Sequence, residues 1–233
     1  MIRYLKGEFL KFFYNKWALI VMIGTVVFIP VMAATLGSFF GETGKELVRS
    51  KILQGLYLGQ VGYVVLGGLY FGREYLRSAL RTSLLSAPVR MKVLLSKFIV
   101  ITLVTLAVFI VSIMFSIIAT GYDEGLGKLI GLILPAFIST MELVMLTCAT
   151  VLVSRSMIAS MAVPVSLILG LGNLLLQYGK VFRFMPVSSS MNGFFIIEAP
   201  TYLKVGTGLV VQGGWCLVLV AVGCWLFGRR AVR

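Results

Sequence analysis

The chain has 233 residues, of which 59% are hydrophobic and 12% charged, and its mean hydropathy is +1.02. Soluble domains carry about 25% charged residues, so this composition excludes a soluble globular protein and predicts an all-α integral membrane protein. The formal net charge is +13. Because the basic residues crowd the ends of apolar runs, we assign this charge to anionic membrane lipids and expect no nucleic-acid partner.

Residues 1–16 predict an amphipathic helix that lies in the membrane interface. Apolar side chains recur on one face at helical spacing, and we expect them to lie among the acyl chains. These residues are Ile2, Leu5, Phe9, Phe12 and Phe13. A cleaved signal peptide is the alternative, but the uncharged run over residues 17–41 is much longer than the apolar region of a signal peptide.

A helix that crosses the hydrocarbon core needs about 20 apolar residues, and several stretches of the chain meet this requirement. The predicted spans are residues 17–36, 52–72, 98–119, 129–153, 157–177 and 205–227. Together they make residues 17–233 a single transmembrane domain. In the second span, Gly55 and Gly59 form a GxxxG pattern, which allows another helix to approach closely. We expect this pattern to serve packing within the chain rather than dimerisation.

Lysine and arginine indicate the orientation of these spans. The segments before the first span and after the second, fourth and sixth spans carry 14 of the 21 basic residues. Cytoplasmic loops carry such an excess, so we expect a multi-pass cell-membrane protein with both termini in the cytoplasm.

The segment between the second and third spans is basic and amphipathic. Arg73, Arg77 and Arg81 recur every four residues and so form one row on a helix, beside a row of leucines. Pro88 ends this helix, because proline cannot continue the hydrogen-bond ladder. The pattern favours a docking helix for a cytoplasmic partner, and a basic loop that only sets topology is the alternative.

Residues 179–204 are too apolar for an ordinary external loop. We expect short helices that dip back into the outer leaflet, where protein covers their backbone. A folded cap that packs on the spans without re-entering the membrane is the alternative.

Glu142 is the one ionisable residue deep in a predicted span. A charge at mid-membrane costs roughly 2.5–3.5 kcal/mol on insertion scales, so we expect Glu142 to face the bundle interior and to accept hydrogen bonds from Ser or Thr on a neighbouring helix. Binding of a cation or a substrate amine is the alternative. Gln60, Asn173 and Gln177 are further polar residues in spans, and such groups join helices more often than they contact cargo.

The sequence contains no phosphate-binding GxxxxGK[ST] loop and no GxSxG elbow. Without a catalytic constellation or a metal-ligand cluster, we expect neither enzymatic activity nor a bound metal or cofactor on this chain.

In its elements and their order, the chain resembles permease subunits of the ABC-2 family. The resemblance includes the N-terminal interfacial helix, six spans, a short external loop after the third span and a long apolar loop before the sixth. It is most specific after the second span, where Glu74 precedes a short helix, a turn from Pro88 to Arg90, and Lys97 at the start of the third span. Chain length and small external loops are most similar to bacterial lantibiotic-immunity and bacitracin-resistance permeases.

The resemblance implies that two permease chains, identical or related, pair in the membrane and that ATP-binding subunits on separate chains, which hold ATP and Mg, dock beneath them. A coupling helix over residues 72–86 would enter a groove on each ATPase. The implied docking residues are Arg73, Glu74, Arg77, Leu80, Arg81, Leu84, Pro88 and Arg90. The second and fifth spans would line the cargo path, with Gln60, Glu142, Asn173 and Gln177 as candidate residues.

The cargo implied by the subfamily is an amphipathic antimicrobial peptide or drug, exported for resistance or immunity. Export of a lipid or polysaccharide is an alternative within the family. A stand-alone channel or ion-coupled transporter is an alternative outside it, against which the single intramembrane charge and the lack of internal repeats both argue. A membrane anchor without a transport role is a third reading.

Overall fold

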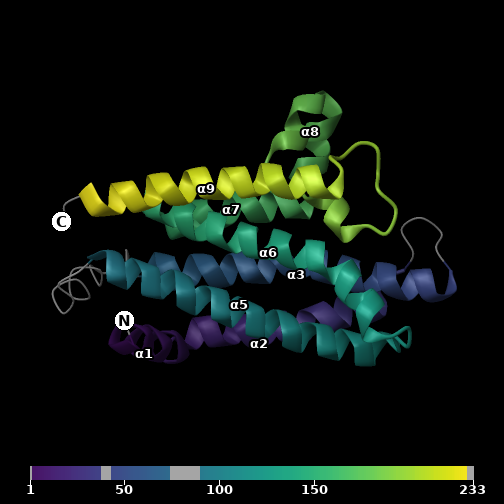
Figure 1. The fold of residues 1–233 in the computed structure, drawn as a ribbon, viewed down its shortest axis with the longest axis horizontal. Coiled ribbons are helices and arrows are strands. Elements are labelled where there is room, and N and C mark those ends of the chain that lie inside the picture. The colour runs from purple at the N-terminus through teal and green to yellow at the C-terminus, as the bar shows by residue number, and fades with distance from the viewer. Residues whose placement is uncertain (1, 38–42, 74–89, 230–233) are drawn as a thin grey trace.

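The computed structural model describes residues 2–37, 43–73 and 90–229, and within these ranges the chain forms helices and no strand (Figure 1). Among the described residues, 6 helices are long and apolar enough to cross a membrane. They are Lys16–Thr35, Gly44–Gly72, Met91–Thr120, Gly127–Ser154, Met157–Tyr178 and Val205–Arg229. The prediction of an all-α membrane protein with six spans is therefore confirmed.

Apart from α8, which projects from the bundle, the long helices run nearly parallel along the long axis of the molecule (Figure 1). The principal ones are α1 (Ile2–Phe13), α2 (Lys16–Thr35), α3 (Gly44–Gly72), α5 (Arg90–Thr120), α6 (Leu126–Ser154), α7 (Met157–Ser166), α8 (Gly172–Tyr178) and α9 (Val205–Arg229). The start of α1 and the end of α9 lie at the same end of the bundle, which we call the α1 end. At the other end, the loop end, α3 begins and α5 turns into α6.

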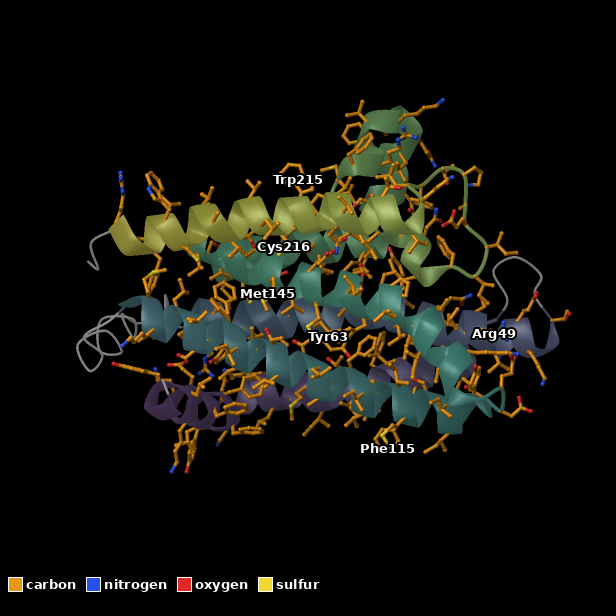
Figure 2. All side chains as sticks on the ribbon, viewed as in Figure 1. Arg49, Tyr63, Phe115, Met145, Trp215 and Cys216 are labelled. Carbon is orange, nitrogen blue, oxygen red and sulfur yellow. The ribbon has the colours of Figure 1, made fainter. Side chains whose placement is uncertain are left out.

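Helix α3 is the centre of the bundle and packs against α2, α5, α6 and α7. In its apolar stretch 67% of the residues are buried, compared with 22% in α2 and 11% in α9. Tyr63 on α3 lies between the ribbons, whereas Phe115 on α5 points outward (Figure 2). Outward-facing apolar side chains of this kind suit a surface in contact with acyl chains, which are as apolar as leucine.

Glycines on α3 allow α2 to approach closely. A Cβ added to Gly55 would lie 2.8 Å from the backbone oxygen of Ile29 and 3.1 Å from the Cβ of Ala33, and a Cβ on Gly59 would collide with the Ile29 side chain. The GxxxG pattern therefore serves packing within the chain, as predicted.

Helix α3 begins at Gly44, not at residue 52 as predicted. The additional turns carry charges that pair with acids in the connection between α5 and α6. Arg49 donates to Glu124, and Lys45 Nζ lies 3.9 Å from Asp123 Oδ1. These ion pairs allow the helix to extend beyond the apolar stretch.

The fifth span, predicted over residues 157–177, contains a break. After α7 the chain makes a π-helical turn (Leu167–Leu171), and Gly170 adopts φ 126° there. This backbone conformation strongly favours glycine. Beyond the break, α8 turns away from α7 and α9 (Figure 1). Pro164 lies inside α7, before the break.

Replacing Gly55 with alanine should force α2 and α3 apart, because its methyl group would overlap the backbone of Ile29. Overpacking of this kind costs typically 1–3 kcal/mol, so we expect a lower melting temperature in detergent. Gly24→Ala on α2 is the matched control, since nothing lies within 4 Å of a Cβ there. Equal melting temperatures for the two variants would contradict the close packing.

Candidate functional site

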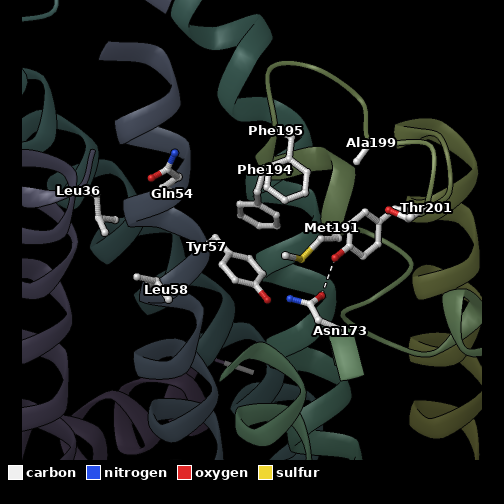
Figure 3. Close-up of a pocket in the computed structure, with 11 residues that line it drawn as sticks. Leu36, Gln54, Tyr57, Leu58, Asn173, Met191, Phe194, Phe195, Ala199 and Thr201 are labelled. Atoms are coloured by element: carbon white, nitrogen blue, oxygen red, sulfur yellow. Dashed lines mark hydrogen bonds between the residues drawn. The ribbon is translucent and has the colours of Figure 1, made fainter. Parts of the chain in front are cut away.

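A pocket with a cavity volume of about 390 Å³ opens between α3, α8 and the loop that precedes α9 (Figure 3). It lies in the half of the bundle nearer the loop end. Its lining is mostly apolar and aromatic and includes a few amide and hydroxyl groups. The lining residues are Leu36, Gln54, Tyr57, Leu58, Asn173, Met191, Phe194, Phe195, Ala199, Thr201 and Tyr202.

Helix α3 supplies one wall of the pocket through Gln54, Tyr57 and Leu58. The Tyr57 hydroxyl donates to the Ile168 carbonyl at 2.8 Å, and its ring meets the Phe194 ring edge-to-face at a centroid distance of 5.5 Å. Because Ile168 lies in the π-helical turn before Gly170, Tyr57 ties the central helix to the point where the fifth span breaks.

Gln54 is a buried amide at the pocket, with 4% of its surface exposed. Its Nε2 donates to Ser50 Oγ at 2.9 Å, while its Oε1 accepts no hydrogen bond from the described part of the chain. A buried acceptor without a donor costs free energy, of the order of 1–3 kcal/mol. A hydrogen-bond donor on a ligand would therefore stabilise the side-chain carbonyl of Gln54.

Helix α8 and the loop form the opposite wall. Asn173 Oδ1 on α8 accepts a hydrogen bond from the Tyr202 hydroxyl at 2.6 Å, drawn as a dashed line in Figure 3. The Tyr202 ring also lies 6.0 Å from the ring of Phe195. The break at Gly170 is what turns α8 so that Asn173 reaches this loop.

The loop over residues 179–204 is folded and largely covered by protein. It contains two short 3-10 helices, Lys180–Phe184 and Met191–Phe194, and their insertion into the outer leaflet stays a prediction. Asn192 holds its outer part, since Nδ2 donates to the carbonyls of Ala199 and Leu203 at 3.1 and 3.0 Å, and Oδ1 accepts from the Ala199 amide at 3.0 Å.

A buried polar network fixes the inner part of this loop between α6 and α9. Gln212 on α9 accepts from the Ser190 hydroxyl at 2.5 Å and from the Val187 amide at 3.3 Å, and it donates to the Ser139 carbonyl at 2.8 Å. Ser139 also donates to Ser190 at 2.8 Å. The loop and α9 pack closely here, as shown by Gly208 of α9: a Cβ at this position would collide with the Ser189 carbonyl.

Val187 adopts φ 71°, which is rare and costly for a β-branched residue. It keeps this conformation because its amide is bound to Gln212 and its side chain is buried. The loop that forms this wall of the pocket is therefore held by hydrogen bonds as well as by apolar packing.

The composition of the lining decides what the pocket can bind. No charged residue contributes to it among the described residues. Ligand sites of this kind bury apolar and aromatic groups and orient them through a few polar atoms. The pocket suits the apolar part of an amphipathic molecule that carries hydrogen-bonding groups.

The structure does not bring the four predicted cargo residues together. Asn173 lines the pocket, whereas Gln60 is buried in α3 and donates to Ser139 at 3.4 Å, as expected for a residue that joins helices. Gln177 is exposed on α8. Glu142 is half-buried on α6 beside Gly213. The predicted Ser or Thr partner of Glu142 is not found, since its buried Oε2 accepts no hydrogen bond from the described residues.

Most of the predicted docking residues lie outside the described residues. This holds for Glu74, Arg77, Leu80, Arg81, Leu84 and Pro88. Arg90 begins α5. Arg73 is described and exposed, and it donates to Asn15 Oδ1 in the connection between α1 and α2.

An ion cluster lies at the α1 end, close to the end of α3 and the start of α5. The predicted docking segment connects these two helices. Glu8 on α1 is only 4% exposed. Its Oε2 lies 2.9 Å from Lys97 Nζ on α5 and accepts from the Tyr70 hydroxyl on α3 at 3.0 Å, while its Oε1 lies 2.7 Å from Lys11 Nζ. Lys97 also lies over the Tyr70 ring, 4.8 Å from its centroid.

The sequence prediction for α1 needs a correction. Phe12 does not lie among acyl chains, because it is fully buried and meets the Tyr70 ring edge-to-face at 5.5 Å. Leu5 and Phe9 are partly buried against the same core, and Phe13 is half exposed. The apolar face of α1 therefore packs largely on the bundle.

Glu8 was not singled out from the sequence as a buried, ion-paired residue. The signal was its position, three residues after Leu5 and four before Phe12, which places it on the apolar face of the helix. A charge at such a position requires a partner.

The Glu8 cluster should make stability depend on acid pH. Burial alone would raise the pKa of Glu8, but the charge of Lys97 and hydrogen bonds from Lys11 and Lys97 outweigh it and lower the pKa below 4.5. A lowered pKa in the folded state stabilises the fold above the ordinary pKa, and this stabilisation is lost as the pH falls through the folded-state value. Glu8→Gln should therefore lower the melting temperature at neutral pH and reduce its fall on acidification.

The matched control is Glu46→Gln, since Glu46 is exposed near the start of α3. It should keep the wild-type dependence on pH. Identical acid profiles for Glu8→Gln and the wild type would show that the cluster does not stabilise the fold.

Comparison with known proteins identifies the family. The family profile described as "ABC-2 family transporter protein" matches residues 4–181, which cover α1 to α8. Comparisons with curated proteins and with solved structures gave no match. The profile matches more than half of the chain and agrees with the six apolar helices. The chain therefore belongs to the ABC-2 transporter family, as a multi-pass membrane protein that forms the transmembrane component of an ABC transporter and works with an ATP-binding subunit.

Proposed function

We propose that the chain is the permease subunit of an ATP-driven exporter that removes an amphipathic antimicrobial peptide or drug, and so provides resistance or immunity. The observation that carries this proposal is the pocket between α3, α8 and the loop, with its uncharged aromatic lining. Its volume of about 390 Å³ accommodates one or two side chains of a peptide or part of a drug-sized molecule.

The position of the pocket supports export of a molecule that partitions into the membrane. Tyr57 and Asn173 come from helices that belong to spans, so cargo reaches them from within the bundle rather than from the water on one side. An amphipathic molecule has an apolar face for this lining, and its donors can pair with the Gln54 carbonyl.

The working assembly contains two permease chains and two ATP-binding subunits, which hold ATP and Mg. Helix α2 has an exposed apolar surface that suits contact with a second permease chain or with lipid. On this surface, Trp17, Ile20 and Ile23 are more than half exposed. The ATP-binding subunits dock on the basic segment after α3, where leucines enter a groove and arginines meet carboxylates at its rim. With both termini in the cytoplasm, this segment and α1 face the ATPase.

A variant that fills the pocket should reduce export. Ala199 lines the pocket, so Ala199→Phe places a ring in the cavity without removing any existing contact. In cells that express the complete transporter, we expect several-fold lower protection against an amphipathic peptide, with unchanged membrane level and recovery of the ATPase. Ala119→Phe on the exposed face of α5 is the matched control. Full protection in the Ala199 variant would exclude the pocket from the cargo path.

Charge and shape in the docking segment should decide binding of the ATPase. We expect Leu80→Asp and Arg77→Glu to lose the ATP-binding subunit in a detergent pull-down of the co-expressed proteins, while membrane insertion is unchanged. Lys180→Glu, an exposed basic residue at the loop end, is the control and should retain the subunit. If the wild-type chain purifies alone and without ATPase activity, the exporter proposal is wrong and a channel or membrane anchor replaces it.

A further inference from the structure

Three helices meet at one carboxylate oxygen at the α1 end. Glu8 Oε2 on α1 accepts from the Tyr70 hydroxyl of α3 and forms the ion pair with Lys97 of α5. Its other oxygen is bound to Lys11 on α1 itself. The loss of the single charge on Glu8 would therefore weaken the polar links of α1 to both α3 and α5.

The partners of Glu8 lie close to the two helix ends that flank the predicted docking segment. Tyr70 is two residues before the end of α3 at Gly72, and Lys97 is two turns after the start of α5 at Arg90. The chain between these ends contains the residues assigned to docking of the ATPase. Any displacement of that segment must be transmitted through α3 and α5, because these two helices are its covalent neighbours.

The apolar contacts of α1 do not explain the ion cluster. Phe12 is fully buried, and Leu5 and Phe9 pack against the core, so the helix could bind without a buried charge. A buried ion pair is poor evidence for stability, because an apolar replacement of similar volume often stabilises a fold equally well. What an ion pair adds is direction, since its hydrogen bonds fix how α1 is rotated and how far α3 and α5 lie apart.

We propose that Glu8 is a positioning residue for coupling: through Tyr70 and Lys97 it makes α1, the end of α3 and the start of α5 move as one unit when the ATPase displaces the docking segment. This inference rests on the proposed function. In the wild type, the displacement reaches α3, the helix that carries the wall of the pocket. Without Glu8, α1, the end of α3 and the start of α5 no longer move as one unit, and ATP is hydrolysed without export.

The Glu8→Gln variant tests this proposal directly, because glutamine keeps the shape of the glutamate side chain. Only one of its two terminal atoms can accept hydrogen bonds, so its NH₂ group must face either Lys11 or the pair formed by Lys97 and Tyr70. In either orientation a donor faces a donor and the amide carries no charge, so the ion pair with Lys97 is lost while the apolar contacts of α1 remain.

The experiment compares export per ATP hydrolysed in the complete transporter, reconstituted in vesicles and supplied with an amphipathic antimicrobial peptide as probe. We expect Glu8→Gln and Lys97→Met each to lower this ratio several-fold, with normal recovery of the ATPase. The double variant should lose no more than either single variant, because both break the same link. Tyr70→Phe, which removes one hydrogen bond and keeps the ring, should have a smaller effect. Lys6→Met, an exposed lysine on α1, should keep the wild-type ratio.

An unchanged ratio in Glu8→Gln would overturn the inference. So would additive losses in the double variant, or variants that lose membrane yield and bound ATPase while the remaining complexes keep the wild-type ratio, since this would assign the cluster to stability alone. Wild-type vesicles that hydrolyse no ATP and export no peptide would instead overturn the proposed function, together with everything that rests on it.

Discussion

In a bilayer, apolar helix faces gain little from meeting one another, because lipid tails solvate them equally well, so association depends on close contact between backbones. In this protein that contact is made by α3. Its glycines accept the backbone of α2 at Ile29, and further glycines on α3 lie against Cys148 of α6 and Met161 of α7. The position of α3 is thereby fixed on three sides, and every functional feature described above uses it. Tyr57 carries the wall of the pocket near one end of α3, and Tyr70 binds the ion cluster near the other.

The two ends of α3 solve different physical problems. Towards the loop end, amides and hydroxyls leave a cavity whose lining is uncharged and incompletely hydrogen-bonded, so it can exchange one partner for another. At the α1 end, a charge is buried with donors from three helices, an arrangement that tolerates little variation in distance or angle. Under the proposed function, adaptable contacts in the cargo pocket and rigid contacts near the ATPase suit a transporter that accepts a class of molecules but is driven by ATP alone.

Features that depend on length and hydropathy could be predicted from the sequence, because the thickness of the bilayer imposes them on any chain. The six spans and the packing role of Gly55 are of this kind. The break at Gly170 could not be predicted, since many glycines of this chain lie in regular helix and only tertiary contacts show which one bends. The pocket combines residues from α3, α8 and a loop that are far apart in the sequence. Glu8 could be recognised as unusual on an apolar face, but its partners Tyr70 and Lys97 become evident only when the helices are placed together.

The loop before α9 has a consequence for how the protein is made. Its buried serines leave the ribosome before α9, yet their hydrogen bonds are completed by Gln212, which lies within α9. Until that helix is inserted, the amide of the strained Val187 lacks its acceptor, and Ser190 has Ser139 of α6 but not Gln212 as a partner. The site is consequently the last part of the molecule to mature during synthesis, and a nascent chain whose earlier spans are already in the membrane has no finished pocket.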